Sequence, residues 1–174
     1  DETDRTDRQG PAADLIKKLN RPLFLRGRTI VNRLVLAPMT FLGHVALRQL
    51  VDEFGGCGLL WTEMCSSRIV PRENPRTSAF FRWREKERHR LVCQLFGSEP
   101  DTMAEAAKRV KRESFFGVDI NFGCSTGAIC RQNCGAALLR DPVRAQKIVA
   151  AVRRTVQIPL FVKFRTGWSD TPAD

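Results

Sequence analysis

One cysteine of this chain stands where a thiol could carry chemistry. Cys124 closes the segment Asn121-Phe-Gly-Cys124, directly after an apolar run that reads as a buried strand. A thiol on a tight turn at the end of a strand faces the rim of a sheet, where it can act as a nucleophile, a general acid or a redox centre. Free cysteines are also among the most buried residues and are usually inert. From the spacing alone, a purely structural role of Cys124 therefore stays an alternative.

Two more polar side chains lie near the ends of apolar runs. These are Gln94 and Lys163. A buried polar group needs a partner, and an inward-facing lysine needs an anion or an electron-rich ligand. Lys163 is therefore a candidate for stabilising negative charge on a bound cofactor. A surface lysine, or one paired with Asp119 or Glu63, fits the pattern equally well.

The chain is strongly basic. It has 29 Lys and Arg against 19 Asp and Glu, a net charge of +10. Such a surplus attracts polyanions, with nucleic acid the leading partner and an anionic membrane surface second, although an ordinary basic enzyme surface fits as well. Residues 68–90 contain seven arginines and Lys86, with Phe80, Phe81 and Trp83 among them. This mixture suits RNA phosphates and bases, but a solvated loop with packed aromatics is an equal alternative.

Several classes of protein are excluded or disfavoured. No run approaches the ~20 apolar residues that a membrane span needs. Neither G-x-G-x-x-G nor a P-loop occurs, and His44, His89 and the six cysteines show no metal-ligand spacing, so we expect no metal. Cysteines without a disulfide pattern favour a reducing compartment, and we expect a cytoplasmic protein. The first residue is Asp1 rather than Met, so a removed organelle signal stays open.

The elements that position these residues alternate between strand and helix. Five apolar runs are predicted as buried strands, at residues 34–38, 58–62, 91–96, 116–121 and 160–164. One-sided helices are predicted at 44–54, from Ser98 with an N-cap there, and from Asp141-Pro142. The third of these helices has the apolar face Ala145, Ile148, Val149, Val152 and Val156, and the second has Met103, Ala106, Ala107 and Val110. Before them we expect a loose arm at 1–13, a short helix at 14–19 and a hairpin about Arg26-Gly27.

This alternation predicts an α/β fold with a parallel sheet. A doubly wound sheet and a (β/α)8 barrel both fit, and the barrel is favoured because polar residues gather at the ends of several strands. A full barrel needs about 250 residues, so the 174 residues would supply roughly its first five strands. We divide the chain into an arm and short helix at 1–21 and the amino-terminal part of a catalytic barrel at 22–174.

Four blocks of sequence resemble the tRNA-dihydrouridine synthases, flavin enzymes that reduce uridines in tRNA. The blocks are Leu36-Ala-Pro-Met-Thr40 with Arg48 downstream, Thr62-Glu-Met64, Gln94-Leu-Phe-Gly97, and Asp119-Ile-Asn-Phe-Gly-Cys124 with Gly135-Ala-Ala-Leu-Leu139, Val162-Lys-Phe-Arg165 and Gly167-Trp168. They run in the family's order from about Leu34 to Asp170.

The resemblance implies a TIM barrel with FMN at its rim and tRNA as substrate. It implies flavin contacts from Pro38, Met39, Gln94 and Lys163. Asn121 would lie beside the flavin or the target base, and we assign Asn121 and Arg165 to substrate binding. Cys124 corresponds to the family's general acid, which protonates C5 of uracil while the flavin N5 delivers hydride to C6. NADPH would re-reduce the flavin, and the target base would leave its stack.

The loop that carries the thiol departs from the family pattern. Ser125 replaces a usual proline, Ala128 a common lysine and Asn133 a glycine. Two alternatives therefore stay open. Residues 24–40 also resemble the opening of old-yellow-enzyme flavoproteins, which reduce activated alkenes. A truncated, non-catalytic barrel that binds RNA is the other alternative.

Overall fold

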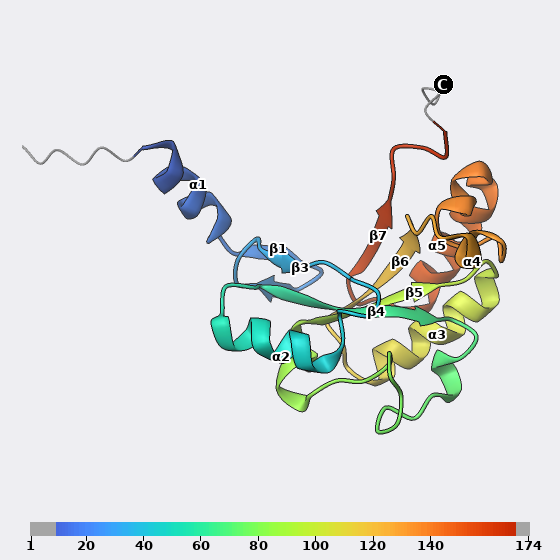
Figure 1. Ribbon diagram of the computed structural model, residues 1–174, viewed down its shortest axis with the longest axis horizontal. Coiled ribbons are helices and arrows are strands. Elements are labelled where there is room, and N and C mark those ends of the chain that lie inside the picture. The colour runs from blue at the N-terminus through green and yellow to red at the C-terminus, as the bar shows by residue number, and fades with distance from the viewer. Residues whose placement is uncertain (1–9, 170–174) are drawn as a thin grey trace, which may run out of the picture.

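Five parallel strands form one sheet in the computed structural model, which describes residues 10–169 (Figure 1). The strands are β3 (Val35–Leu36), β4 (Leu59–Ser66), β5 (Leu91–Phe96), β6 (Gly117–Phe122) and β7 (Leu160–Phe164). Their order is β3-β4-β5-β6-β7, so each strand pairs with the next in sequence. A doubly wound sheet reverses its strand order at a switch point. The sequential order found here is that of a barrel wall, and all five predicted strands are present.

Two strands differ in length from the prediction, and β6 is shifted by one residue. β3 has only two residues, and Val35 is 50% exposed, because this edge strand pairs with β4 alone. The predicted buried strand at 34–38 is wrong in both length and burial. β4 extends four residues beyond the predicted end, through Glu63 and Cys65, since neighbouring elements bury these residues although their mixed polarity breaks the apolar run.

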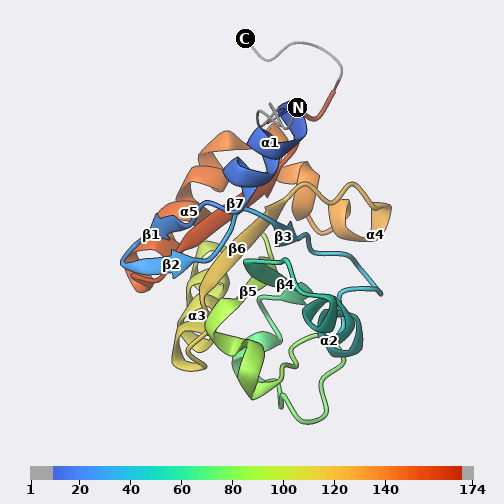
Figure 2. The same ribbon diagram turned by 90° about the vertical axis from the view of Figure 1, so that its left-hand side faces the viewer.

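The helices α2 (Val45–Phe54), α3 (Pro100–Arg112) and α5 (Pro142–Thr155) follow β3, β5 and β6. α2 and α5 lie at opposite ends of the sheet (Figure 2). All four predicted face residues of α3 are buried, and in the predicted face of α5 Ile148, Val152 and Val156 are buried. The side chain of Asp141 caps α5 by accepting from the Arg144 N–H at 2.9 Å. The predicted cap at Ser98 is wrong, because α3 begins one residue later, after Glu99, with no side-chain cap.

The core has two parts on the two faces of the sheet. The larger part packs residues of α3 and α5, such as Met103 and Ile148, against the strands. The smaller part lies at the amino ends of the strands and contains Ile30, Trp61 and Phe116. Ile30 belongs to the hairpin of β1 (Leu23–Leu25) and β2 (Arg28–Ile30), whose turn at Arg26 and Gly27 has positive φ at both residues, as predicted. The hairpin therefore packs against the amino-terminal end of the sheet.

The amino-terminal helix α1 (Pro11–Leu19) stands apart from the sheet (Figure 1). It begins three residues before the predicted helix, because Pro11 is well placed in a first turn. None of its residues is buried, and Leu15 and Ile16 are more than half exposed. The predicted arm is thus helical from residue 11, and its residues 1–9 lie outside the described part of the chain.

The segment after β4 is more ordered than a polar loop. It holds two 3-10 turns, η1 (Val70–Arg72) and η2 (Glu85–Arg90), and the fully buried Phe81. Glu87 is also buried, and its carboxylate accepts from the Arg48 guanidinium at 2.7 Å. Arg48, one of the residues of the family resemblance, therefore ties α2 to this segment.

Candidate active site

The carboxyl ends of β5, β6 and β7 bring three predicted site residues together. Gln94 stands opposite Asp119 in the pairing of β5 with β6, and Asn121 stands opposite Lys163 in the pairing of β6 with β7. Because parallel strands end at the same edge, these side chains and the following Cys124 loop share one rim of the sheet.

The thiol is held by the backbone around it. The Asn121 side-chain oxygen accepts from the N–H groups of Gly123 at 3.1 Å and Cys124 at 2.9 Å, which fixes the turn. Cys124 is half-buried, and its sulfur lies 3.3 Å from the Thr126 hydroxyl. Thr126 was not predicted as a site residue.

A second segment supports the Cys124 loop from behind. The Ala136 N–H donates to the Cys124 carbonyl at 2.9 Å, from the 3-10 turn η3 (Gly135–Arg140). Gly135 has a φ of 63°, and a Cβ at this position would lie 2.5 Å from the same carbonyl oxygen. Only glycine allows this close approach, which explains the first residue of the Gly135-Ala-Ala-Leu-Leu139 block.

Arg165 contacts the loop from the end of β7. Its Nε donates to the Gly123 carbonyl at 2.6 Å, and its terminal nitrogen lies 3.3 Å from the Ser125 hydroxyl. The serine that replaces the family's proline thus gains a partner. The structure gives Arg165 a place beside the thiol, and its predicted contact with substrate stays a prediction.

A buried hydrogen-bond network connects the thiol loop to the interior of the sheet. Asn121 donates to the Gln94 side-chain oxygen at 2.9 Å, and Gln94 donates to the Asp119 carboxylate at 2.6 Å. The Trp61 indole donates to the same carboxylate oxygen at 3.0 Å. Gln94 is only 1% exposed and both ends of its amide are engaged, so the structure gives it a positioning role. Its predicted flavin contact stays a prediction.

Asp119 is a further functional candidate, which was not among the predicted site residues. Burial raises the pKa of its carboxyl, while the hydrogen bonds from Gln94 and Trp61 and the charge of Lys163 act in the opposite direction. Its second oxygen is buried and has no hydrogen-bond partner among residues 10–169. The available signal was a charged residue in the middle of the apolar run 116–121. It pointed to a buried carboxylate without showing its partners.

A cavity of about 240 Å³ lies beside Asp119. It opens on the face of the sheet that carries Trp61 and Phe161, which we call the inner face. Pro38, Trp61, Phe161 and Lys163 contribute to its lining. The structure therefore places the predicted residues Pro38 and Lys163 at one cavity. It does not place Met39 or Gln94 in that lining.

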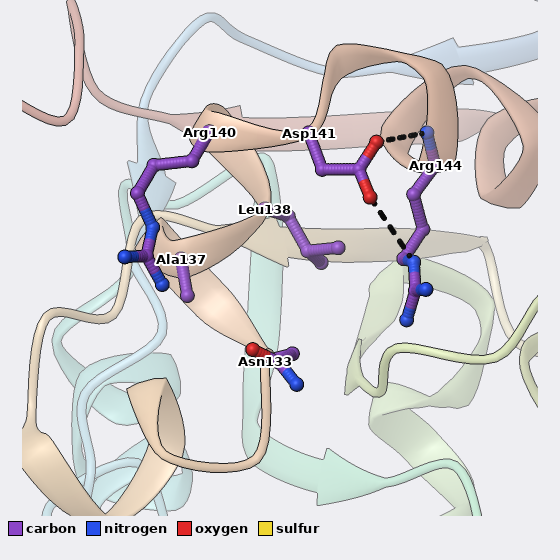
Figure 3. A pocket seen from close by; sticks show the side chains of 6 residues that line it. All are labelled: Asn133, Ala137, Leu138, Arg140, Asp141 and Arg144. Atoms are coloured by element: carbon purple, nitrogen blue, oxygen red, sulfur yellow. Dashed lines mark hydrogen bonds and ion pairs between the residues drawn. The ribbon is translucent and has the colours of Figure 1, made fainter.

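The loop changes noted in the sequence preserve its backbone. Asn133 has a φ of 54°, in the left-handed region that glycine and asparagine tolerate best. It lines a separate pocket of about 330 Å³ with Arg140, Asp141 and Arg144, in which Asp141 pairs with Arg144 (Figure 3). Ala128 is exposed on the short helix α4 (Gly127–Cys130).

Metal-binding clusters, disulfides and membrane-spanning helices are absent from residues 10–169. No group of three or more His, Cys, Asp or Glu in this part of the chain could hold a metal ion. All six cysteines are free. None of the helices described is both long and apolar enough to span a membrane.

Comparison with known proteins identifies a family. Residues 35–174 match the family model described as dihydrouridine synthase. The chain is 37% identical over 140 residues to tRNA-dihydrouridine synthase B of Pseudomonas aeruginosa, covering 80% of this chain and 42% of that protein. It is 32% identical over 163 residues to a probable tRNA-dihydrouridine synthase 1 of Synechocystis, covering 86% of this chain and 42% of the relative. The chain thus spans less than half the length of these relatives.

The matched region contains all five parallel strands and the Cys124 loop. The (β/α)8 barrel of the family accounts for the sequential strand order, in which β3 to β7 are the first five barrel strands. The chain therefore belongs to the dihydrouridine synthase family.

Proposed function

We propose that this chain carries the flavin-binding and proton-donating part of a tRNA-dihydrouridine synthase. The enzyme would reduce the C5=C6 bond of uridines in tRNA, with NADPH as the reductant. The observation that supports this most directly is the position of Cys124, whose backbone is anchored on both sides at the carboxyl rim of the sheet. The free cysteines are compatible with a cytoplasmic enzyme.

The residues along the inner face fit a flavin. The cavity beside Asp119 holds an unpartnered buried acceptor and the cationic Lys163 on neighbouring strands. A ring system with polar edges and an electron-rich end matches this pair. Pro38, Met39 and Lys163 would hold FMN, with Gln94 behind them. When bound and reduced, FMN supplies the hydride that C6 of uracil requires.

Cys124 would supply the proton. Addition of hydride to C6 and of the thiol proton to C5 saturates the double bond, and the thiolate left behind recovers a proton from water. Because Asn121 and Ala136 hold the backbone N–H and C=O of Cys124, its Cα is fixed at the rim, and the sulfur can move only by rotation about the Cα–Cβ bond. Such positioning is the main contribution that a rigid scaffold makes to proton transfer.

Asn121 and Arg165 complete the substrate side in this proposal. Arg165 is exposed, and its guanidinium lies between the thiol loop and the end of β7. A cation at this place can contact the phosphate or the carbonyl groups of a uridine that has left its stack. Asn121 acts mainly through the turn that it holds.

Substitution of Cys124 tests the proposal. In the full-length protein, Cys124→Ala should abolish dihydrouridine in tRNA, measured by mass spectrometry of nucleosides, while the flavin absorbance stays unchanged. Cys57→Ala is the matched control, because this half-buried thiol lies outside the site. Normal turnover by Cys124→Ala would remove the thiol from the mechanism.

The visible spectrum tests the cofactor separately. The full-length protein should show flavin bands that bleach on anaerobic addition of NADPH. A colourless protein that does not take up added FMN would contradict the proposed flavin cofactor. A flavoprotein that reduces an enone but forms no dihydrouridine would instead support the ene-reductase alternative.

A further inference from the structure

A second pocket, of about 230 Å³, opens at the carboxyl rim next to the thiol loop. It is lined by apolar side chains from several elements, among them Phe41, Met64, Phe80, Phe96 and Ile129. Phe41 is 78% exposed and Phe80 is 40% exposed, so neither is explained by packing within the described core. The one carboxylate in the lining, Glu73, already accepts from the Ser78 hydroxyl.

This pocket adjoins the residues that hold Cys124. The Met64 sulfur lies 3.0 Å from the Asn121 side-chain nitrogen, and Asn121 fixes the Cys124 turn. Ile129 lies on α4, five residues after the thiol, and approaches Gly135 behind the loop. A group bound in the pocket would therefore lie beside the reacting uridine.

The segment that supplies Phe80 carries unneutralised positive charge. Arg68, Arg72, Arg76 and Arg82 are exposed, and none forms an ion pair within residues 10–169. By contrast, Arg84 and Arg90 both pair with Asp52. Arg68 and Arg72 line a hollow beside the start of α3, where Asp101 and Glu105 partly offset their charge. Arg76 and Arg82 flank Phe80 in the sequence and are exposed.

Exposed aromatic rings beside free arginines match one class of partner. Unpaired RNA offers flat bases that stack on aromatic side chains and phosphates that pair with arginine. An apolar peptide would satisfy the pocket but not the four cations. The charge of the segment therefore favours nucleic acid over protein.

We propose that the pocket and Arg68, Arg72, Arg76 and Arg82, together called the rim surface, bind the RNA strand next to the target uridine. A base adjacent to that uridine enters the pocket and stacks on Phe80 or Phe41, while the arginines contact the phosphates that follow. This inference rests on the proposed function for the identity of its RNA, and it assigns the segment 68–90 to substrate binding.

Binding of a tRNA transcript to the full-length protein tests the rim surface. We expect Phe80→Ala to weaken binding by about 5- to 150-fold, the range for loss of one stacked base. Arg76→Ala with Arg82→Ala should weaken binding and lower the slope of log affinity against log salt by roughly 1 for each lost phosphate contact. These two arginines are chosen because Arg68 and Arg72 share a hollow with Asp101 and Glu105.

Arg112→Ala is the matched control, since this exposed arginine ends α3, away from the rim. It should leave both affinity and salt slope unchanged. In turnover, the rim variants should raise KM and leave kcat and the flavin spectrum near the wild-type values. A purely structural role of Phe80 would alter the flavin spectrum or the unfolding midpoint of Phe80→Ala and leave its tRNA affinity unchanged.

Unchanged tRNA affinity in both rim variants, with an unchanged salt slope in the arginine variant, would overturn the inference, whatever the wild-type enzyme does. If the wild type bound an acidic or apolar peptide, and Phe80→Ala lost that binding while its tRNA affinity stayed intact, the inference would also be overturned, in favour of a protein partner. If the wild type forms no dihydrouridine but the rim variants lose RNA binding, the proposed function fails and the rim surface stands. The two proposals therefore fail on different measurements.

Discussion

Substitution of Gly135 tests whether close backbone packing positions the thiol. Gly135→Ala places a methyl group 2.5 Å from the Cys124 carbonyl oxygen, a separation that Cβ atoms do not adopt. The same residue has a φ of 63°, where a non-glycine residue is strained. Relief requires movement of the Cys124 backbone itself, because the blocking atom is not a flexible side chain.

The expected cost follows from two contributions. A left-handed alanine costs about 1–2 kcal/mol relative to glycine. Displacement of the carbonyl also weakens the hydrogen bond from the Ala136 N–H, worth about 1 kcal/mol. We therefore expect the free energy of unfolding to fall by about 2–3 kcal/mol. A shift of the thiol by the order of 1 Å can lower turnover about 100-fold.

Urea denaturation and dihydrouridine formation measure the two effects in the full-length protein. Gly127→Ala is the matched control on the same loop, because its Cβ would meet only the far end of the exposed Arg131 side chain, at 3.1 Å. The control should keep near wild-type stability and turnover. Equal stability and equal turnover of the two alanine variants would refute the reasoning from close packing.

Three further substitutions probe buried charge and capping. Because burial raises the pKa of Asp119 above its ordinary 3.8, the folded protein holds this proton more tightly than the unfolded chain. The unfolding free energy of the wild type should therefore rise relative to Asp119→Asn as pH falls from neutral towards the raised pKa, and a pH-independent difference in urea denaturation would contradict this. Glu87→Gln leaves Arg48 buried without its counter-charge and should lower the unfolding free energy by about 3–5 kcal/mol in the same assay. Asp141→Ala removes the cap on α5 and should cost about 1 kcal/mol, seen as a lower thermal midpoint.

The sequence predicted the strands and helices well where one local pattern decides. Runs that are apolar except for one residue indicate β5 and β7, whose observed bounds equal the predicted ones. β3 was less predictable, since its exposure depends on having a neighbour on only one side. The charges of residues 68–90 predict a solvated or RNA-binding loop and give no sign of its buried ion pair, because the pairing of Glu87 with Arg48 joins residues 39 apart in sequence. The periodicity of apolar residues in a local stretch of sequence cannot reveal such a distant pair.

The candidate site shows the same division. The thiol position follows from the turn Asn121-Phe-Gly-Cys124, which local sequence displays directly. The contact of Trp61 with Asp119 spans 58 residues and two intervening strand pairings. It depends on register across the sheet, which a single sequence does not specify. The pairing could be found only once the strands were placed side by side.

The way the loop is anchored also indicates where substrate choice can change. Gly123 and Cys124 are held through backbone groups, by Asn121, Ala136 and Arg165. None of these bonds uses the side chain at position 125 or 128, and both positions are exposed. Replacement there changes the exposed surface of the loop, and at position 125 it also removes the hydroxyl that lies 3.3 Å from the Arg165 terminal nitrogen. The hydrogen bonds to Gly123 and Cys124 keep their own donors and acceptors.

Asn133, the third departure from the family pattern, differs from these two in kind. Its φ of 54° is a backbone requirement that glycine or asparagine meets, so this change conserves the loop shape. Exchange of Ser125 for proline and of Ala128 for lysine should therefore shift which tRNA is preferred while the rate with a saturating good substrate stays within about threefold, because no bond that holds the thiol is broken. Competition between tRNA transcripts measures the preference. A collapse of kcat in that double variant would show that the loop side chains, rather than its backbone anchors, position Cys124.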